Sequence, residues 1–374
     1  MGSVIFAGCS SDYQSDNQAQ EASVIRFSPN VLPMTRVALT NSSGELIKFQ
    51  NGDEMDVYAL YNGEVYFHTD FGYSDMGFQS AAPYYWPAME DGSPLTFYAT
   101  VNATQVEPGK FLNFVPEPSV FEQRDVLVAK YSATQQEDLV MLNFRHALTQ
   151  VNVWVKNSNN DFQVTVSGLR VGYVKTASES FAYTEQAETK MRNADNISLN
   201  CWKLIDFQEP AANETYASNY MYEQEVAWTL VGKQPPSMLG GEKRWMLLPQ
   251  ELKRFDKDAD GKKVYHTKKS EATTTLPDLS GAYIGLNLKI EYLNEGKAVG
   301  TLADQWCYWP IDDLADWQAG FVYSYIVDVA TGGYHGDNQD DNPTLDPVLK
   351  TMAFGGVSVD VYDPEDYNLD KMEF

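Results

Sequence analysis

Hydrophobic and polar residues alternate in short runs along most of the chain. In the run 95–101 (LTFYATV), every second residue is a buried-type apolar residue, which is the period of a half-buried β-strand, and the run 56–61 (DVYALY) is a short apolar stretch of similar length. Turn-forming pairs such as NG, DG and PG separate these runs. Short strands joined by tight turns are typical of an all-β sandwich rather than of alternating strands and helices. We expect at most one or two short helices beside them.

The same pattern continues through the second half, where residues 283–293 form the clearest predicted strand. One face of this strand is apolar and the other polar: Leu286, Leu288, Ile290 and Tyr292 against Asn287, Lys289 and Glu291. No repeat with a fixed period marks a solenoid or a propeller. The simplest interpretation is two β-sandwiches in series, divided between residues 140 and 165.

The N-terminal region is of a different kind. Residues 10–22 are rich in Ser, Asp, Asn and Gln and have no apolar period, which is typical of a solvated linker. Residues 23–32 alternate, but Pro29 and Pro33 cannot donate a backbone hydrogen bond to a neighbouring strand. We therefore expect this segment to be a short strand or the edge strand of its sheet.

Length and charge narrow the class of protein. The chain has 374 residues, enough for two domains that each bury an apolar core. It carries 52 acidic and 27 basic residues, a formal net charge of −25, so nucleic acid and anionic lipid surfaces are poor partners. No run of 18 apolar residues occurs, and a membrane-spanning helix is not expected.

Three cysteines are present, Cys9, Cys201 and Cys307. The last two stand beside tryptophans, and we consider buried thiols at least as plausible as a disulfide between them. The pairing of Cys201 with Cys307 stays open at this stage.

The residues that usually carry catalysis are not arranged for it. The four histidines, His68, His146, His266 and His335, show no metal-ligand spacing. The chain has no G-x-S-x-G elbow, no P-loop and no strand-associated G-x-G-x-x-G motif. With 52 carboxylates, any chosen glycosidase pair carries no weight. We predict that the protein is not an enzyme and needs no cofactor.

Two weaker patterns have a structural and a functional interpretation. Asp256, Asp258 and Asp260 copy the start of a calcium-binding loop, but Thr267 stands where that loop needs a bidentate Glu, so a polar hairpin turn is favoured. Trp86, Trp306 and Trp309, with neighbouring tyrosines, could form a platform for sugar rings. Packing at the edge of a sandwich is favoured for these aromatics.

Several segments together resemble one known family. They are VLPMTRVAL (31–39), YYWPAMEDGSPLTFYA (84–99), DVLVAKYSAT (125–134) and VMLNFRHALTQVNVWVK (140–156), followed in order by LLPQ (247–250), WQAGFVYSYIVDV (317–329) and FGGVSVDVYDPED (354–366). Their order and spacing resemble the fimbrillin-like family, the type V pilins and related surface lipoproteins of Gram-negative anaerobes. The similarity covers nearly all of residues 23–365.

The resemblance implies a fold and a route of assembly. Family members consist of two tandem transthyretin-like β-sandwiches and are exported as lipoproteins to the outer membrane. In polymerising members a trypsin-like protease cuts after an Arg beyond the first strand. That strand leaves, and a strand from the next subunit fills the groove, bound by backbone hydrogen bonds and by pockets for alternate side chains.

These implications fall on particular residues of this chain. Residues 1–22 correspond to a signal-peptide remnant, a lipobox and a linker, and Cys9 is the lipidation candidate. Phe6 stands in the place of the usual Leu, and the charged start of a signal peptide is missing. Arg36 is the best candidate for protease cleavage, and Arg26 is a poorer one because it falls within the predicted strand. Whether Arg36 is cut or is an ordinary surface residue stays open.

The two sandwiches are expected at residues 23–145 and 146–374. Two segments are candidate donor strands: one carries Val357, Val359 and Val361, and the other is the final YNLDKMEF (367–374). Arg145 and His146 match a segment of the family, and we expect His146 to be buried and hydrogen-bonded at the junction of the domains.

We therefore predict a structural or adhesive fimbrial subunit, an outer-membrane lipoprotein at the cell surface or in the fimbrium. Its partners would be other pilin subunits, joined by strand addition, and host or bacterial surface glycans or proteins. Membrane contact would be through the lipid anchor only. The alternative is a surface lipoprotein that does not polymerise and binds glycans. The position of the subunit at tip, stalk or anchor stays open.

Overall fold

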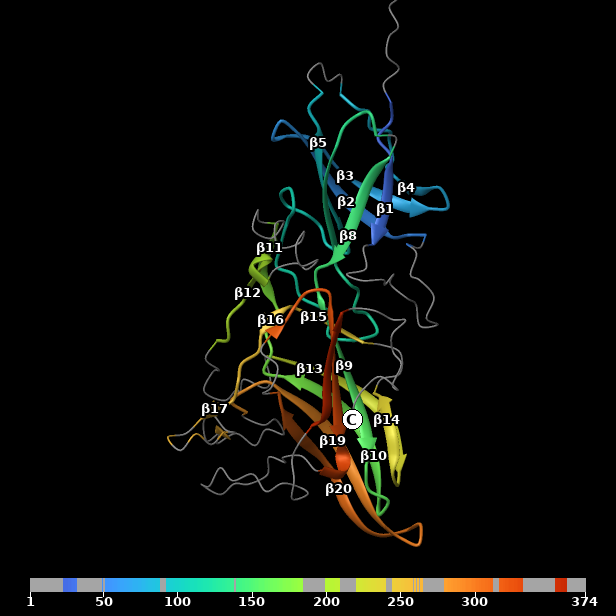
Figure 1. The fold of residues 1–374 in the computed structure, drawn as a ribbon, viewed down its shortest axis with the longest axis vertical. Helices are drawn as coiled ribbons and strands as arrows, with labels where there is room; N and C mark the ends of the chain where they lie inside the picture. Colours follow the sequence, from blue (N-terminus) through green and yellow to red (C-terminus); the bar gives the residue numbers. More distant parts are fainter. Residues whose placement is uncertain are drawn as a thin grey trace, which may run out of the picture.

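The computed structural model describes strands over most of the chain. The described residues are 23–31, 49, 51–87, 92–137, 139–183, 199–208, 220–239, 244–257, 259, 261, 263–264, 279–311, 316–331 and 354–361. In Figure 1 the strands form two groups along the long axis of the molecule, with a small set of strands between them. The all-β architecture predicted from the alternating pattern is confirmed.

The first group of strands forms one sheet of seven. In sheet order the strands are β1 (Phe27–Val31), β8 (Val140–His146), β7 (Leu127–Ala133), β5 (Leu95–Val101), β2 (Glu54–Tyr61), β3 (Glu64–Ser74) and β4 (Gly77–Gln79). All neighbours are antiparallel except β1 and β8, which are parallel. The sheet order places β1 at one edge.

The sheet folds over on itself. β8 pairs with β7 at only two positions, so β8 and β1 can leave the plane of the other strands and form a second layer over them. β7 and β8 meet at Leu127 with His146 and at Val128 with Arg145, and β8 then runs beside β1 across β2 and β3 (Figure 1). The space between these layers holds a cluster of buried apolar side chains, many of them aromatic. The apolar face of β5 contributes Leu95, Phe97, Ala99 and Val101.

Tight turns follow the sequence signals. Asn62 and Gly63, between β2 and β3, both have positive φ angles of 50° and 84°, as a two-residue hairpin turn requires. The NG pair thus sets the hairpin that brings the side chains of β2 and β3 together.

The second group of strands forms two facing sheets. One sheet contains, in order, β13 (Met221–Val231), β10 (Phe162–Gly172), β19 (Tyr283–Asn294) and β20 (Lys297–Pro310). The other contains β14 (Gln234–Met238), β9 (Thr149–Asn157), β22 (Phe321–Asp328) and β23 (Phe354–Val361), with β15 (Trp245–Leu247) also paired to β9. Val153 on β9, Val164 on β10 and Leu288 on β19 belong to the core between them. Two sheets around one core form a β-sandwich.

A small sheet and a third apolar cluster lie between the two groups. The sheet order is β12 (Trp202–Leu204), β11 (Ser178–Ala182) and β6 (Lys110–Leu112). Phe111, Phe181 and Trp202 pack together here, and the Trp202 Nε1 donates a 2.9 Å hydrogen bond to the carbonyl of Ala147. The link between β8 and β9 is therefore held from the side by elements of both halves of the chain.

The remaining described elements are short. They are the pairs β16 (Gln250–Glu251) with β21 (Asp316–Trp317) and β17 (Asp256–Lys257) with β18 (Lys263–Val264), and the 3₁₀ helices η1 (Leu199–Cys201) and η2 (Val329–Thr331). The described stretches thus contain two helices of three residues each, as the pattern predicts. They include no apolar helix of the length that crossing a bilayer requires.

The division of the chain at residues 145 and 146 stays a prediction. In its favour, β8 ends the first sheet at His146, and β9 enters the second group at Thr149. The transthyretin-like character of each sandwich likewise stays an implication of the resemblance.

Candidate functional site

The first strand and the edges that hold it form the candidate site. Residues 23–25, just before β1, lie against Tyr84–Trp86, a segment that we call the lip. The Ile25 amide donates to the Tyr84 carbonyl at 2.8 Å, and the Trp86 amide donates to the Ser23 carbonyl at 3.0 Å. Val24 and Tyr85 form the antiparallel bridge between these two bonds.

A second edge holds the same segment from the other side. β1 pairs in parallel with β8, in register from Phe27 opposite Val140 to Val31 opposite Phe144. The Val140 amide also donates to the Arg26 carbonyl at 2.8 Å. The chain thus passes from the lip to β8 within a few residues, and each edge supplies part of its backbone hydrogen bonds.

Alternate side chains of the segment point into the core of the first sheet. Ile25 and Phe27 are buried, whereas Arg26 between them is exposed. The Phe27 ring meets the rings of Phe71 and Phe97 edge-to-face, at 4.9 Å and 5.4 Å between centroids. We call Phe71 and Phe97 the aromatic seat. Edge-to-face contacts are a favoured arrangement of aromatic rings and add to the gain from burying their area.

Pro29 shows why this strand lies at an edge. It sits within β1 opposite Leu142, and it has no N–H to give to a second neighbour. β1 is the terminal strand of the sheet order, which confirms the edge strand that the sequence predicts. Pro33 lies outside the described residues.

The site can therefore bind an extended peptide. Without residues 23–31, the lip and β8 would each present an unpaired backbone edge, and the core would lose two apolar side chains. Burial of one such side chain stabilises a fold by about 1.5–3 kcal/mol. An exposed strand edge beside apolar pockets is the arrangement to which peptides add as a further strand.

The other residues predicted to act in assembly lie elsewhere. Cys9 and Arg36 fall outside the described residues. The backbone of β23 pairs antiparallel with β22 at the edge of the second sandwich, with Val357, Val359 and Val361 opposite Tyr325, Tyr323 and Phe321. The candidate donor strand with these valines is thus paired within its own chain.

The calcium half-motif is only partly described. Asp256 lies in β17 and forms an ion pair of 2.7 Å with Lys253, while Asp258 and Asp260 lie outside the described residues. Over the described ranges, no three His, Cys, Asp or Glu side chains come together as a metal site would need.

The tryptophans that could form a sugar platform are packed within the fold. Trp86 and Trp309 are 5% and 1% exposed, so neither ring can stack on a ligand at the surface. Trp306 is half-buried, with the Arg170 guanidinium 3.5 Å from its ring centroid. The packing interpretation of Trp86 and Trp309 is confirmed.

Cys201, Cys307 and His146 are also part of the packing. Cys201 lies in the cluster between the two groups of strands and Cys307 in the core of the second sandwich, both as buried thiols. Burial raises the pKa of the Cys307 thiol to about 12. His146 is buried and hydrogen-bonded through Nδ1 to Asp125, where β8 meets β7, which confirms the burial and the hydrogen bond expected of this residue.

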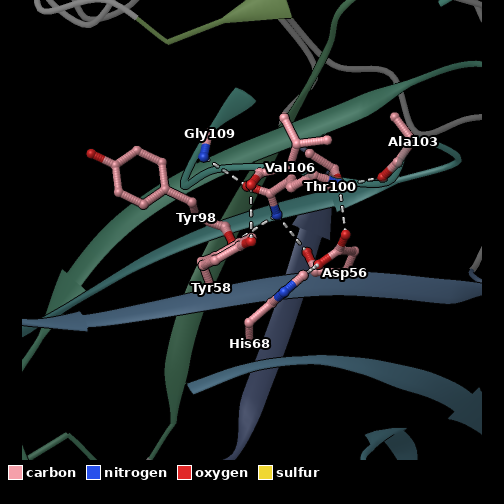
Figure 2. A network of polar contacts seen from close by, with 9 residues as sticks. Asp56, Tyr58, His68, Tyr98, Thr100, Ala103, Val106 and Gly109 are labelled. Carbon is pink, nitrogen blue, oxygen red and sulfur yellow. Dashed lines mark hydrogen bonds and ion pairs between the residues drawn. The ribbon is translucent and has the colours of Figure 1, made fainter. Parts of the chain in front are cut away.

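The first sheet also holds a buried polar network that the sequence does not predict (Figure 2). Asp56 accepts a 2.7 Å hydrogen bond from the Gln105 amide and lies 2.7 Å from Nε2 of His68. The Gln105 side chain donates to the carbonyls of Asp56 and Tyr98, at 2.9 Å and 3.2 Å, and accepts from the Gly109 amide at 2.7 Å. These bonds fasten the loop between β5 and β6 to the sheet.

The electrostatics of this network suit a structural role. Burial raises the pKa of the Asp56 carboxyl, while hydrogen bonds from Gln105 and His68 oppose that shift. The His68 ring stacks on Tyr58 at 3.7 Å between centroids. Asp56 and Gln105 are 49 residues apart in the sequence, so no local sequence pattern predicts their contact. Only the NG turn, which brings β3 back along β2, places His68 near Asp56.

The chain is similar to known proteins in sequence and in structure. The chain matches the family described as fimbrillin-like over residues 35–331. A fimbrial protein from Bacteroides vulgatus is similar in structure, with a TM-score of 0.50 and 14% identity over 81% of this chain and 94% of that one. A protein from Bacteroides uniformis with a suggested role in cell adhesion has a TM-score of 0.45 and 13% identity, over 91% of this chain and 98% of that one.

At such identities, likeness to the Bacteroides vulgatus structure speaks for the fold alone. A search among curated proteins found no match. The family match, in contrast, spans well over half of the sequence. The chain therefore belongs to the fimbrillin-like family.

Proposed function

We propose that this protein is a structural or adhesive subunit of a fimbrium that joins other subunits by strand addition. The observation that carries the proposal is the way residues 23–31 are held. They complete the core of the first sheet with Ile25 and Phe27, and among the residues that the structure describes their backbone pairs with the lip and with β8. A segment bound in this way can be exchanged for another strand of matching side chains.

Cleavage would make the exchange practicable. A cut after Arg36 would leave residues 1–36 attached to the rest of the protein only by noncovalent contacts. The candidate lipid anchor Cys9 lies in the same fragment. Release of this fragment would therefore remove the anchor and the first strand together, and a strand of another subunit would restore the lost hydrogen bonds and apolar contacts.

The proposal also implies where the precursor is located and that it acts without catalysis. The precursor would be carried to the cell surface as a lipoprotein of the outer membrane, and it would act through assembly rather than catalysis. Burial of Trp86 and Trp309 removes the main support for the alternative, a glycan-binding protein that does not polymerise.

Mild trypsin treatment of the purified chain tests the proposal. We expect one early cut after Arg36, followed by a ladder of detergent-resistant oligomers on gel electrophoresis. Arg36→Ala should prevent both, whereas Arg26→Ala should prevent neither. A clean cut after Arg36 that yields only monomers would refute the proposed function.

A further inference from the structure

We propose that the aromatic seat selects the strand that replaces residues 23–31. The incoming strand would carry an aliphatic side chain at the place of Ile25 and an aromatic ring, two residues along, at the place of Phe27. This inference rests on the proposed function and adds to it the chemical pattern of the partner strand.

The geometry at Phe27 is that of an aromatic ring between two others. The interplanar angles to Phe71 and Phe97 are 85° and 88°, so both contacts are close to perpendicular. Each edge-to-face pair adds stability beyond the burial of area. An aliphatic side chain at this place would lose both ring contacts and would leave part of the space unfilled.

The two backbone edges fix which residue reaches the seat. The Ile25 amide bonds to the lip on one side, and the Arg26 carbonyl accepts from Val140 on the other. A slip by one residue would turn the side chain of Arg26 into the core and expose Ile25 and Phe27. The seat therefore receives one defined position of the strand, and the pattern aliphatic, any residue, aromatic is required in that register.

This requirement separates the two candidate donor strands. The segment with Val357, Val359 and Val361 offers only aliphatic side chains at alternate positions, and its backbone already pairs with β22. The segment 367–374, YNLDKMEF, contains the required pattern. We therefore name residues 367–374 of a second copy of this chain as the occupant of the groove.

The segment offers the pattern in either direction. Met372 followed by Phe374 matches Ile25 and Phe27 for a strand that runs in the direction of β1. Leu369 with Tyr367 matches them for a strand that runs in the opposite direction. Substitution of each ring in turn therefore reveals the orientation of the bound strand.

Hydrogen exchange of the intact chain tests the seat without any assembly. Phe27→Leu should speed the exchange of the amides in residues 25–31 about tenfold, as the loss of about 1.4 kcal/mol from two aromatic contacts requires. The matched control Ile25→Leu should change the exchange less than twofold. Equal exchange in the two variants would overturn the aromatic preference.

Competing peptides test the partner strand. After cleavage, immobilised trypsin is removed and peptides are added while the ladder forms. A peptide of residues 367–374 should block the ladder. One of the two substitutions Phe374→Leu and Tyr367→Leu, the one at the ring that occupies the seat, should raise its half-inhibitory concentration about tenfold. A peptide of residues 354–361 should be at least tenfold weaker than the unchanged 367–374 peptide.

The outcomes separate this inference from the proposed function. A ladder blocked equally well by all these peptides would refute the aromatic pattern while the strand exchange itself stands. Cleavage without any ladder would refute the proposed function, and with it the partner strand. Hydrogen exchange would then still decide the preference of the seat for Phe27 over Leu.

Discussion

The residue with the least obvious partners is Asp56, a carboxyl buried in the first sheet beside Gln105 and His68. Its burial means that folding favours the protonated carboxyl, because the pKa in the folded chain lies above the ordinary value of 3.8. Asp56 therefore makes its full contribution to the free energy of unfolding at pH values below the pKa that this carboxyl has in the unfolded chain. This contribution is lost as the pH rises through the folded pKa.

Asp56→Asn should remove this dependence. Asn keeps an acceptor for the Gln105 amide but does not titrate, so the variant gains stability relative to the natural chain as the pH rises. Urea unfolding between about pH 3 and about pH 7 measures the difference in free energy of unfolding. A difference that stays constant with pH would show that the Asp56 pKa is not raised.

The structural surroundings of single residues differ in how well the sequence predicts them. Pro29 predicts an edge strand because its chemistry excludes one neighbour, whatever the rest of the fold. The tryptophans beside Cys201 and Cys307 indicate buried positions but left a disulfide open, and the expectation for His146 came with the family resemblance. The contact of Asp56 with Gln105 is not predicted, because it joins residues 49 positions apart through the folded loop.

The element that decides the proposed function is β1, and its register is given by its pairing with β8 and by the hydrogen bonds of residues 23–25 to the lip. The loop between β5 and β6 adjoins the same sheet, and Gln105 and Gly109 tie it to β2. Gly109 has a φ angle of +71°, and an added Cβ would lie 2.6 Å from the Tyr98 ring. Gly63, in the turn between β2 and β3, has a φ angle of +84° with open space around it.

These two glycines form a matched pair. Gly63→Ala should cost about 1 kcal/mol, because only the backbone conformation is strained. Gly109→Ala should cost about 1–3 kcal/mol more, since the methyl group also collides with Tyr98. Urea unfolding gives both values, and equal losses in the two variants would contradict the close packing at Gly109.

At this scale the sequence predicts strands better than their partners. Alternation and turn residues mark β2, β3 and β5, and the NG pair marks the hairpin between the first two. The parallel pairing of β1 with β8 joins segments more than a hundred residues apart, and no local pattern encodes it. In the sequence the lip is part of the aromatic stretch YYWPA (84–88), and nothing in that stretch indicates its pairing with residues 23–25.

The whole molecule carries a formal net charge of −25, which bears on any assembly of identical copies. Copies of the same sign repel one another in solution, and dissolved salt screens that repulsion. The apolar and backbone contacts of a strand in the groove depend on salt far less. Encounter between subunits, rather than the bound state, should therefore be the step that charge controls.

Raising the salt concentration should speed the growth of the ladder after cleavage. Between about 20 mM and about 200 mM NaCl we expect a severalfold increase in rate. Densitometry of gel samples taken over time measures it, with trypsin activity on a small substrate as the control. A rate that falls with salt would indicate assembly through oppositely charged surfaces instead of strand addition.

The central claim is that residues 23–31 must leave before another subunit can bind. A disulfide between Val24→Cys and Tyr85→Cys tests it. Val24 and Tyr85 are directly opposite each other in the antiparallel bridge between residues 23–25 and the lip, and they share no hydrogen bond with each other. At such a non-hydrogen-bonded pair the two Cα atoms come close enough for a disulfide. A Cys9→Ser background and the Val24→Cys single variant serve as controls.

The measurement is the ladder of oligomers after trypsin treatment, with and without reductant. The oxidised double variant should be cut after Arg36 yet stay monomeric, and reduction should restore the ladder to the level of the single variant. If the oxidised protein forms the same ladder as the reduced protein, subunits join without releasing the first strand, and the account is contradicted.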